Sequence, residues 1–168
     1  MTGPERPPVT VREATLADVD QLLELLVAVA GEGRWIGTEA PFDVERRRQR
    51  MVGDIEGADA VILVAEAGGE LVGELGLHLA RYGVADLGML VAAAWRGRGV
   101  GSALLAEAVE RARAAGAHKI ALQVWPHNAA AIALYERFGF EREGYLRRHY
   151  RRRSGELWDA IVMGLRLD

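Results

Sequence analysis

The apolar positions in the first third of the chain recur at helical spacing. The stripe consists of Val19, Leu22, Leu23 and Leu26. Residues three and four apart share one face of a helix, so this stripe predicts a helix with one buried side. Thr15, with Asp18 three residues later, is typical of a capping box at its start. We expect a short strand over residues 9–12 before it and, after a loop over 31–41, a second helix over 43–55 with a strongly basic outer face.

The next stretch has the spacing of strands. Residues 61–67 are a continuous apolar run of strand length, and the glycine pair 68–69 suits a two-residue hairpin turn. The return strand alternates, which puts Glu74 and His78 on one face and leucines on the other. These leucines are Leu71, Leu75, Leu77 and Leu79. Residues 85–92 predict a third strand, so this part reads as an antiparallel meander.

In the second half of the chain the two spacings alternate. A helix follows residue 99, with the apolar stripe Val100, Leu104, Leu105, Ala108, Val109 and Ala112. Residues 119–125 predict a strand, Asn128 caps another helix, and two final strands run over 140–150 and 157–167. The order β-α-α-β-β-β-α-β-α-β-β predicts an α/β fold with a mixed, mostly antiparallel sheet of about seven strands flanked by four helices.

Length and composition indicate a single domain. The 168 residues contain no internal repeat and no linker-like shift in composition, so we assign one domain to residues 1–168. Residues 1–8 contain three prolines and are expected to be a flexible tail. Residues 1–10 lack the apolar core that a secretion signal would need.

Composition also excludes several classes of function. The absence of cysteine rules out disulfides, thiolate metal sites and a cysteine nucleophile, and it fits the cytoplasm. The net charge of −3 and the pI near 5.9 argue against nucleic-acid binding. No apolar run approaches ~20 residues, so we expect no membrane helix. Four histidines without metal-ligand spacing lead us to expect no metal: His78, His118, His127 and His149.

One segment is strongly basic, the hairpin over residues 142–153. It carries Arg147, Arg148, His149, Arg151, Arg152 and Arg153. It could be a solvated surface or a rim that attracts an anionic ligand or a substrate carboxylate.

The segment from Arg96 to Gly101 reads Arg-Gly-Arg-Gly-Val-Gly and joins a strand to a helix. The first backbone N–H groups of a helix lack helical partners, so such a turn suits a phosphate or pyrophosphate, although it could also be a plain structural turn. A Walker loop would need a lysine before Ser102, and none is present. A dinucleotide fingerprint would open the first βαβ unit, whereas this loop follows a meander.

Two blocks of sequence resemble the GNAT superfamily of acyl-CoA N-acyltransferases. The family signature Arg/Gln-x-x-Gly-x-Gly/Ala matches Arg96, Gly99 and Gly101. The strand at 120–124 and the helix at 128–140, with Asn128 and a Gly-Phe end, resemble the family's second block. The C-terminal part is similar to bacterial small-molecule acetyltransferases that act on free amino acids. The helix block is equally similar to the enzyme that acetylates the N-terminal alanine of a ribosomal protein.

The resemblance implies transfer of acetyl from acetyl-CoA to a primary amine of a small molecule such as an amino acid. A protein or peptide N-terminal acetyltransferase is the alternative, followed by a non-catalytic acyl-CoA-binding regulator; a homodimer is left open. The implied cofactor-binding residues are Met89, Leu90, Val91, Arg96, Gly97, Arg98, Gly99, Val100, Gly101, Ser102 and Asn128.

The resemblance also implies catalytic roles. Tyr135 would protonate the leaving thiolate, although the same tyrosine could be a core aromatic. A backbone N–H near Leu90 would stabilise the oxyanion. The base that deprotonates the amine is Asp86, Glu74 or a water chain, because Gln123 stands where one relative has a glutamate. Side chains expected to wall the acceptor cleft are Trp35, Trp125 and His127, and the tryptophans could instead be core residues.

Overall fold

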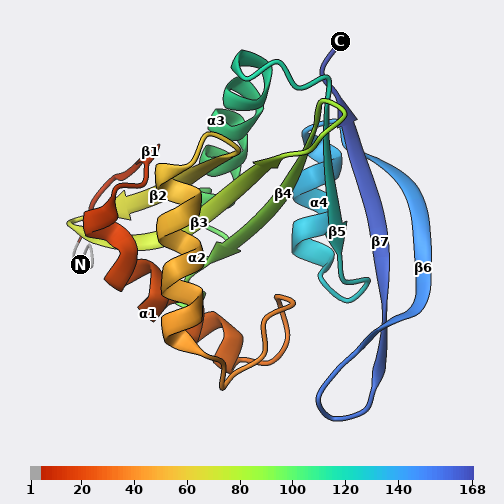
Figure 1. The fold of residues 1–168 in the computed structure, drawn as a ribbon, viewed down its shortest axis with the longest axis horizontal. Helices are drawn as coiled ribbons and strands as arrows, with labels where there is room; N and C mark the ends of the chain where they lie inside the picture. Colours follow the sequence, from red (N-terminus) through yellow and green to blue (C-terminus); the bar gives the residue numbers. More distant parts are fainter. Residues whose placement is uncertain (1–4) are drawn as a thin grey trace.

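The computed structural model describes residues 5–168 as one twisted sheet with helices on both faces (Figure 1). The strands are β1 (Val9–Glu13), β2 (Ala60–Ala67), β3 (Glu70–Leu79), β4 (Val84–Val91), β5 (Lys119–Val124), β6 (Glu141–Arg151) and β7 (Leu157–Arg166). The helices are α1 (Val19–Gly31), α2 (Val44–Glu56), α3 (Val100–Ala114) and α4 (Ala129–Arg137). The sheet order is β1-β2-β3-β4-β5-β7-β6, and only β4 and β5 pair in parallel. The predicted fold class and element order are confirmed.

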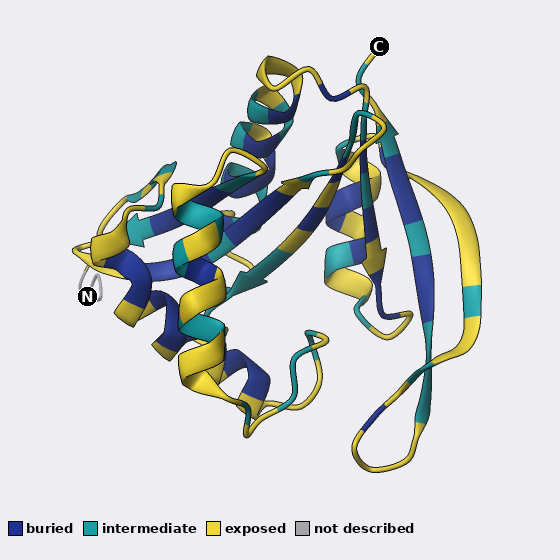
Figure 2. Ribbon diagram, viewed as in Figure 1, coloured by how far each residue is buried: buried dark blue, intermediate teal, exposed yellow. Residues whose placement is uncertain are grey.

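Each face of the sheet has its own core. Helices α1 and α2 cover one face, where Leu22 and Leu26 pack with Val64 and Leu71. Helices α3 and α4 pack on the other face, whose larger core includes Leu104. Buried positions form stripes along the helices, run continuously through the middle of β2 and alternate along β5, while the outer strand β6 is mostly exposed (Figure 2).

One strand prediction is wrong in detail. The sequence pattern placed Leu71 on the same face as Leu75, Leu77 and Leu79, but Leu71 packs against α1 and the others belong to the α3 side. The register between β2 and β3 shifts at Ala65 and Glu66, so β3 contains one extra residue there. A bulge of this kind reverses the alternation, which is why a strict period of two fails.

A short 3₁₀ turn (Leu16–Asp18) precedes α1, and the expected capping box of Thr15 and Asp18 forms at the start of this turn. The carboxylate of Asp18 accepts the Thr15 N–H at 2.7 Å and the Arg12 guanidinium at 2.7 and 2.9 Å. The hydrogen bond from Arg12 is the main reason that the pKa of Asp18 falls to about 2.

The proposed N-terminal tail is covered only in part, because residues 1–4 lie outside the described residues. Arg6 donates to the Ala94 carbonyl at 2.8 Å and lies over the Trp95 ring at 5.3 Å. Within residues 5–168, no helix has the length and apolar character needed to span a bilayer.

Candidate active site

The site lies where β4 and β5 separate. The two strands pair only over residues 84–86 and 119–121, although both continue beyond that point. A cavity of about 590 Å³ fills the resulting gap, which is the size of a small-molecule site. Its walls come from β4, β5, α4, the glycine loop and the α1–α2 loop. Groups from both faces of the sheet therefore meet in one cavity.

The backbone groups of β4 that face this gap belong to Met89 and Val91. Residues in an antiparallel pair alternate between bonding to each other and pointing away. Two bonds show which residues of β3 and β4 bond to each other. The Ala80 N–H donates to the Val84 carbonyl, and the Ala92 N–H donates to the Val72 carbonyl. The register then directs the N–H of Leu90 toward Glu74 on β3. Met89 and Val91, on either side of Leu90, present their N–H groups to the gap, so they are the candidates for the predicted oxyanion donor near Leu90.

The glycine loop forms the start of α3. Gly99 caps the helix with φ of 82°, and Gly97 has φ of 70°, so both positions favour glycine. A Cβ at Gly101 would lie 3.0 Å from the end of the Leu134 side chain on α4, so any larger residue there would require Leu134 to move. Gly97, Val100 and Ser102 also line the cavity. The free N–H groups of this first helical turn can hold a phosphate, so the loop fits the predicted coenzyme.

The two arginines of the loop differ. Arg96 lines the cavity, but its guanidinium binds the Glu32 carboxylate through two hydrogen bonds of 2.8 and 2.6 Å, and its Nε donates to the Val91 carbonyl at 3.1 Å. These contacts lower the pKa of Glu32, mainly through the hydrogen bond from Arg96. Arg98 donates to the Ala94 carbonyl at 3.1 Å and does not line the cavity. Arg96 therefore ties the end of α1 to the end of β4.

Asn128 and Tyr135 of α4 both line the cavity. The Asn128 side chain caps the helix by accepting the Ala131 N–H at 3.3 Å, as predicted. Tyr135 is 6% exposed and packs on Phe140 with ring centroids 5.5 Å apart. Burial raises the pKa of Tyr135 to about 12, so its hydroxyl stays protonated at neutral pH and can donate.

The two candidate bases lie on the opposite face of the sheet, and neither lines the cavity. Asp86 is exposed and stands opposite His78, which contacts Asp54 of α2 at 3.2 Å. Glu74 stands opposite Leu90, which does line the cavity. Burial raises the pKa of Glu74 to about 7, although the positive charge of Arg47 opposes the shift. Within residues 5–168, no group of three or more His, Cys, Asp or Glu is placed to hold a metal ion.

Aromatic rings wall the end of the cavity beside β5. Trp35, Trp125 and Tyr150 line it, as predicted for the two tryptophans. Trp125 meets Tyr150 and Trp158 edge to face, each with centroids 5.1 Å apart. The Tyr150 hydroxyl donates to the Gln123 amide oxygen. His127 lies behind this wall, where its ring packs on Trp158 at 5.2 Å.

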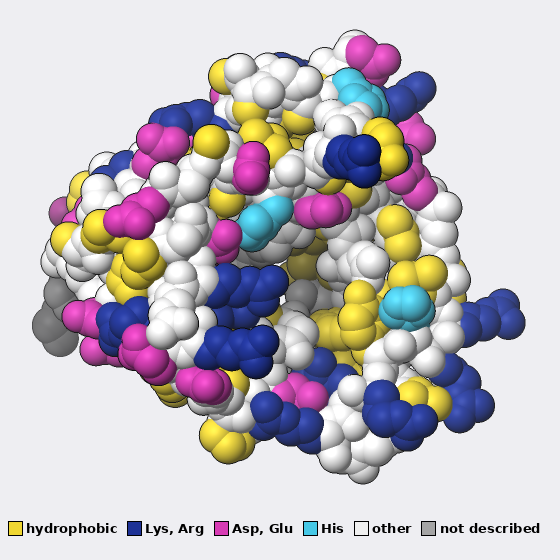
Figure 3. Space-filling view, in the orientation of Figure 1, with side chains coloured by type: hydrophobic (Ala, Val, Ile, Leu, Met, Phe, Trp, Pro, Cys, Tyr) yellow, Lys and Arg dark blue, Asp and Glu magenta, His cyan; other side chains and the backbone are white. Residues whose placement is uncertain are grey.

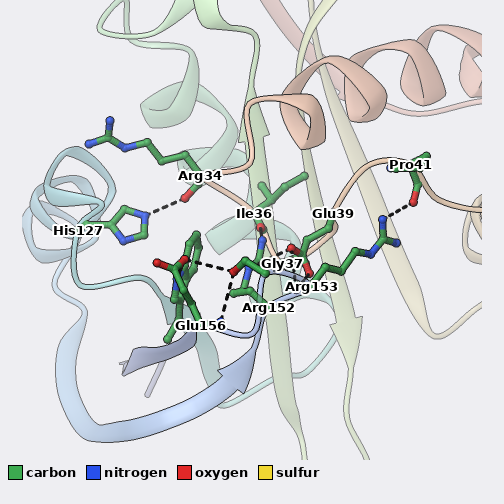
Figure 4. A network of polar contacts seen from close by, with 11 residues as sticks. Arg34, Ile36, Gly37, Glu39, Pro41, His127, Arg152, Arg153 and Glu156 are labelled. Atoms are coloured by element: carbon green, nitrogen blue, oxygen red, sulfur yellow. Dashed lines mark hydrogen bonds and ion pairs between the residues drawn. The ribbon is translucent and has the colours of Figure 1, made fainter.

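Nothing in the amino-acid sequence distinguishes Arg152 from its basic neighbours. The other basic residues of the hairpin are exposed, but Arg152 is 6% exposed. Its guanidinium donates to the carbonyls of Gly37 at 3.0 Å and Ile36 at 3.4 Å, and it lies over Trp158 at 4.3 Å. The Glu39 carboxylate, 3.6 Å from its Nε, supplies the opposite charge. Figure 4 shows this network joining the α1–α2 loop to the β6–β7 hairpin.

Further contacts strengthen the same junction. Arg153 donates its N–H to Glu39 and its guanidinium to the Pro41 carbonyl. His127 contacts the Arg34 carbonyl at 2.8 Å. In Figure 3 the surface is hollowed between α2 and the β6–β7 hairpin, and dark-blue arginines gather on both sides of the hollow.

Comparison with known proteins agrees with this geometry. Residues 22–140 match the acetyltransferase (GNAT) family model. The chain is 29% identical over 164 residues to an L-methionine sulfoximine/L-methionine sulfone acetyltransferase of Pseudomonas paraeruginosa, with 95% of both chains covered. It is 40% identical over 106 residues to an L-amino acid N-acetyltransferase of Escherichia coli, covering 60% of this chain and 65% of that one. A crystal structure of a ribosomal-protein-alanine N-acetyltransferase from Brucella melitensis has a TM-score of 0.85 at 31% identity, covering 94% of this chain and 99% of that one.

The family match spans well over half of the chain and includes the glycine loop, both cavity-lining strands and α4. The resemblance seen in the sequence is confirmed. The chain belongs to the GNAT acetyltransferase family and is an acetyl-CoA-dependent N-acetyltransferase.

Proposed function

We propose that the chain acetylates the primary amine of a small molecule such as a free amino acid. The observation that carries this proposal is the fixed aromatic wall of Trp35, Trp125 and Tyr150 at one end of the cavity. The loop that bears Trp35 is held to the hairpin through buried Arg152, so the wall has little freedom to open. A cavity with one end closed by a wall suits a small acceptor, whereas a peptide needs a groove that continues past that end. Two relatives support the same class, one named for L-methionine sulfoximine and L-methionine sulfone and the other for L-amino acids.

The residues suited to hold the coenzyme lie on the α3 and α4 side. Acetyl-CoA supplies the acetyl group as an activated thioester. The gap-facing backbone of Met89 and Val91 would pair with its extended arm, as an added strand would. The N–H groups at Gly101 and Ser102 would hold its pyrophosphate, helped by the positive end of the α3 dipole. Asn128 would border the arm beside the cap of α4.

In our proposal, three groups carry the chemistry. Glu74 accepts the proton of the acceptor ammonium through a water, since its side chain does not line the cavity, and a pKa of about 7 suits this role. A nitrogen–carbon bond forms as the carbon–sulfur bond breaks, and the N–H of Met89 or Val91 donates to the carbonyl oxygen as it becomes negative. Tyr135 donates its proton to the leaving sulfur. Asp86 stays the alternative base, because it stands on the same face of the sheet, opposite His78.

A peptide N-terminal acceptor is the second candidate, supported by the 31% identity to an enzyme named for ribosomal-protein alanine. Thiol release from acetyl-CoA, measured with free amino acids, polyamines, aminoglycosides and short peptides, separates the two. We expect release with free amino acids and an acetylated amine in the product by mass spectrometry. Release with peptides alone would support the second candidate, and binding of acetyl-CoA without release to any amine would contradict both.

A further inference from the structure

Gly88 leaves part of the cavity wall without any side chain. It lines the cavity from the middle of β4, and a Cβ built on it meets no atom within 4 Å. Its cross-strand neighbour on β3 is Gly76, a second residue without a side chain. On this face, the Glu74–Leu90 pair and the His78–Asp86 pair are therefore separated by a pair without side chains, which we call the bare strip.

The bare strip faces the α1 and α2 side of the sheet. Side chains alternate along β4, and Leu87 and Met89 belong to the core under α3 and α4. Gly88 therefore faces the other way, together with Leu90, which packs against the α1 side. The coenzyme side of the cavity is formed by the glycine loop and α4. An acceptor that meets the thioester from the opposite side must pass over Gly88.

The charges around this strip suit an amine. Glu74 and Asp86 stand on the same face as Gly88, one on each side of the Gly76–Gly88 pair. Asp54, which contacts His78, adds a third carboxylate near Asp86. Arg47 of α2 is the positive group that acts on Glu74. A primary ammonium would be attracted by the carboxylates, while an anionic part of the same molecule would be kept toward α2.

We propose that Gly88 is the floor of the acceptor subsite and that its lack of a side chain determines how large a substituent beside the amine can be accepted. This inference rests on the proposed function. The absence of a side chain leaves room for the substituent that an amino acid carries beside its amine. A larger residue would occupy that room without touching the coenzyme side.

Gly88 is also a position where the substitution can be made cleanly. Its φ is not positive, so alanine or valine can adopt the strand conformation, and valine favours it. Gly73 of β3 is a contrast, because a Cβ there would lie 2.9 Å from Val100. Gly144→Ala is a control at another strand glycine, on β6. Its Cβ would make ordinary contacts of 3.8 and 3.9 Å with Val162, and it does not line the cavity.

The test compares Gly88→Ala and Gly88→Val with the parent enzyme on free glycine, alanine, leucine and phenylalanine. For Gly88→Val we expect kcat/KM to fall ~10–200-fold more for the acceptors with the larger side chains than for glycine. The valine side chain would take the space that one or two methylene groups of those acceptors occupy. The affinity for acetyl-CoA, measured by calorimetry, should be unchanged. Gly144→Ala should keep the acceptor profile of the parent.

An active parent enzyme whose Gly88→Val variant loses the same factor on every acceptor, or none on any, would overturn this inference alone. A parent enzyme that transfers acetyl to no amine would overturn the proposed function as well. Loss of acetyl-CoA affinity in Gly88→Val would place Gly88 in the coenzyme site and would also overturn the inference.

Discussion

At the scale of single residues, burial raises the pKa values of the two groups that we propose for proton transfer. Both Tyr135 and Glu74 have raised pKa values, and burial is the largest cause in each case. For the tyrosine this keeps the proton available for donation at neutral pH. For the glutamate it brings the pKa to about 7, where a base can both accept and release a proton. The same physical effect therefore acts on our proposed acid on one face of the sheet and on our proposed base on the other.

Replacing Tyr135 by phenylalanine tests the acid. The ring and its packing on Phe140 are kept, so the melting temperature should hardly change. The leaving sulfur loses its donor, so kcat should fall by ~10²–10⁴ while acetyl-CoA affinity holds. A stable variant with full kcat, in an enzyme whose chemical step is shown to be rate-limiting, would contradict the role.

Replacing Glu74 by glutamine tests the base. The carboxylate is active when ionised, so kcat/KM of the parent enzyme should rise with pH through about 7 and then level off. Glu74→Gln should lose ~10²–10⁴ of the activity at pH 7 and recover part of it at higher pH, where more of the amine is already neutral. Asp86→Asn, the matched carboxylate on β4, should keep the pH profile of the parent. The reverse result would make Asp86 the base.

Stability gives an independent reading of the same group. The pKa of Glu74 rises from an ordinary value of 4.5 in the unfolded chain to about 7 in the fold. The folded state then binds the proton more tightly, so the free energy of unfolding falls as pH rises from 4.5 to 7. Glu74→Gln should remove this fall, which urea titrations at both pH values can measure.

At the scale of elements, the junction between the α1–α2 loop and the β6–β7 hairpin determines the acceptor end of the site. Its contacts join residues more than 100 positions apart, such as Arg152 and Gly37. The sequence shows the arginines and the tryptophans, but nothing in it says which arginine is turned inward. The bulge that moves Leu71 to the other core is invisible for the same reason, because both features depend on how two segments meet.

Arg152→Met should weaken this junction. The carbonyls of Ile36 and Gly37 lose a charged donor, so we expect a loss of about 2 kcal/mol and a melting temperature ~4–8 °C lower. The acceptor KM should rise while acetyl-CoA affinity is kept, because the glycine loop is not part of the junction. Arg151→Met, an exposed neighbour, should leave the melting temperature unchanged. Loss of stability with an unchanged acceptor KM would show that the junction supports the fold but not the site.

At the scale of the whole molecule, the fold brings two binding sides to one gap in the sheet. Apolar periodicity and the turn and capping residues were enough to predict the element order and the sheet class, whereas the coenzyme loop was implied by the family resemblance. They could not show that β4 and β5 separate, because separation depends on what packs above and below the strands. The gap-facing backbone of Met89 and Val91, the bare strip at Gly88 and the inward turn of Arg152 follow from that tertiary arrangement.

The central claim is that the acceptor is a free small amine, and one comparison tests it most directly. It measures kcat/KM for a free amino acid and for a tripeptide that begins with the same residue, at equal acetyl-CoA concentration. The two acceptors present the same amine and the same first side chain, so only the size beyond that residue differs. We predict that the free amino acid is acetylated with the higher kcat/KM. A tripeptide acetylated as well as, or better than, its free amino acid would contradict the account.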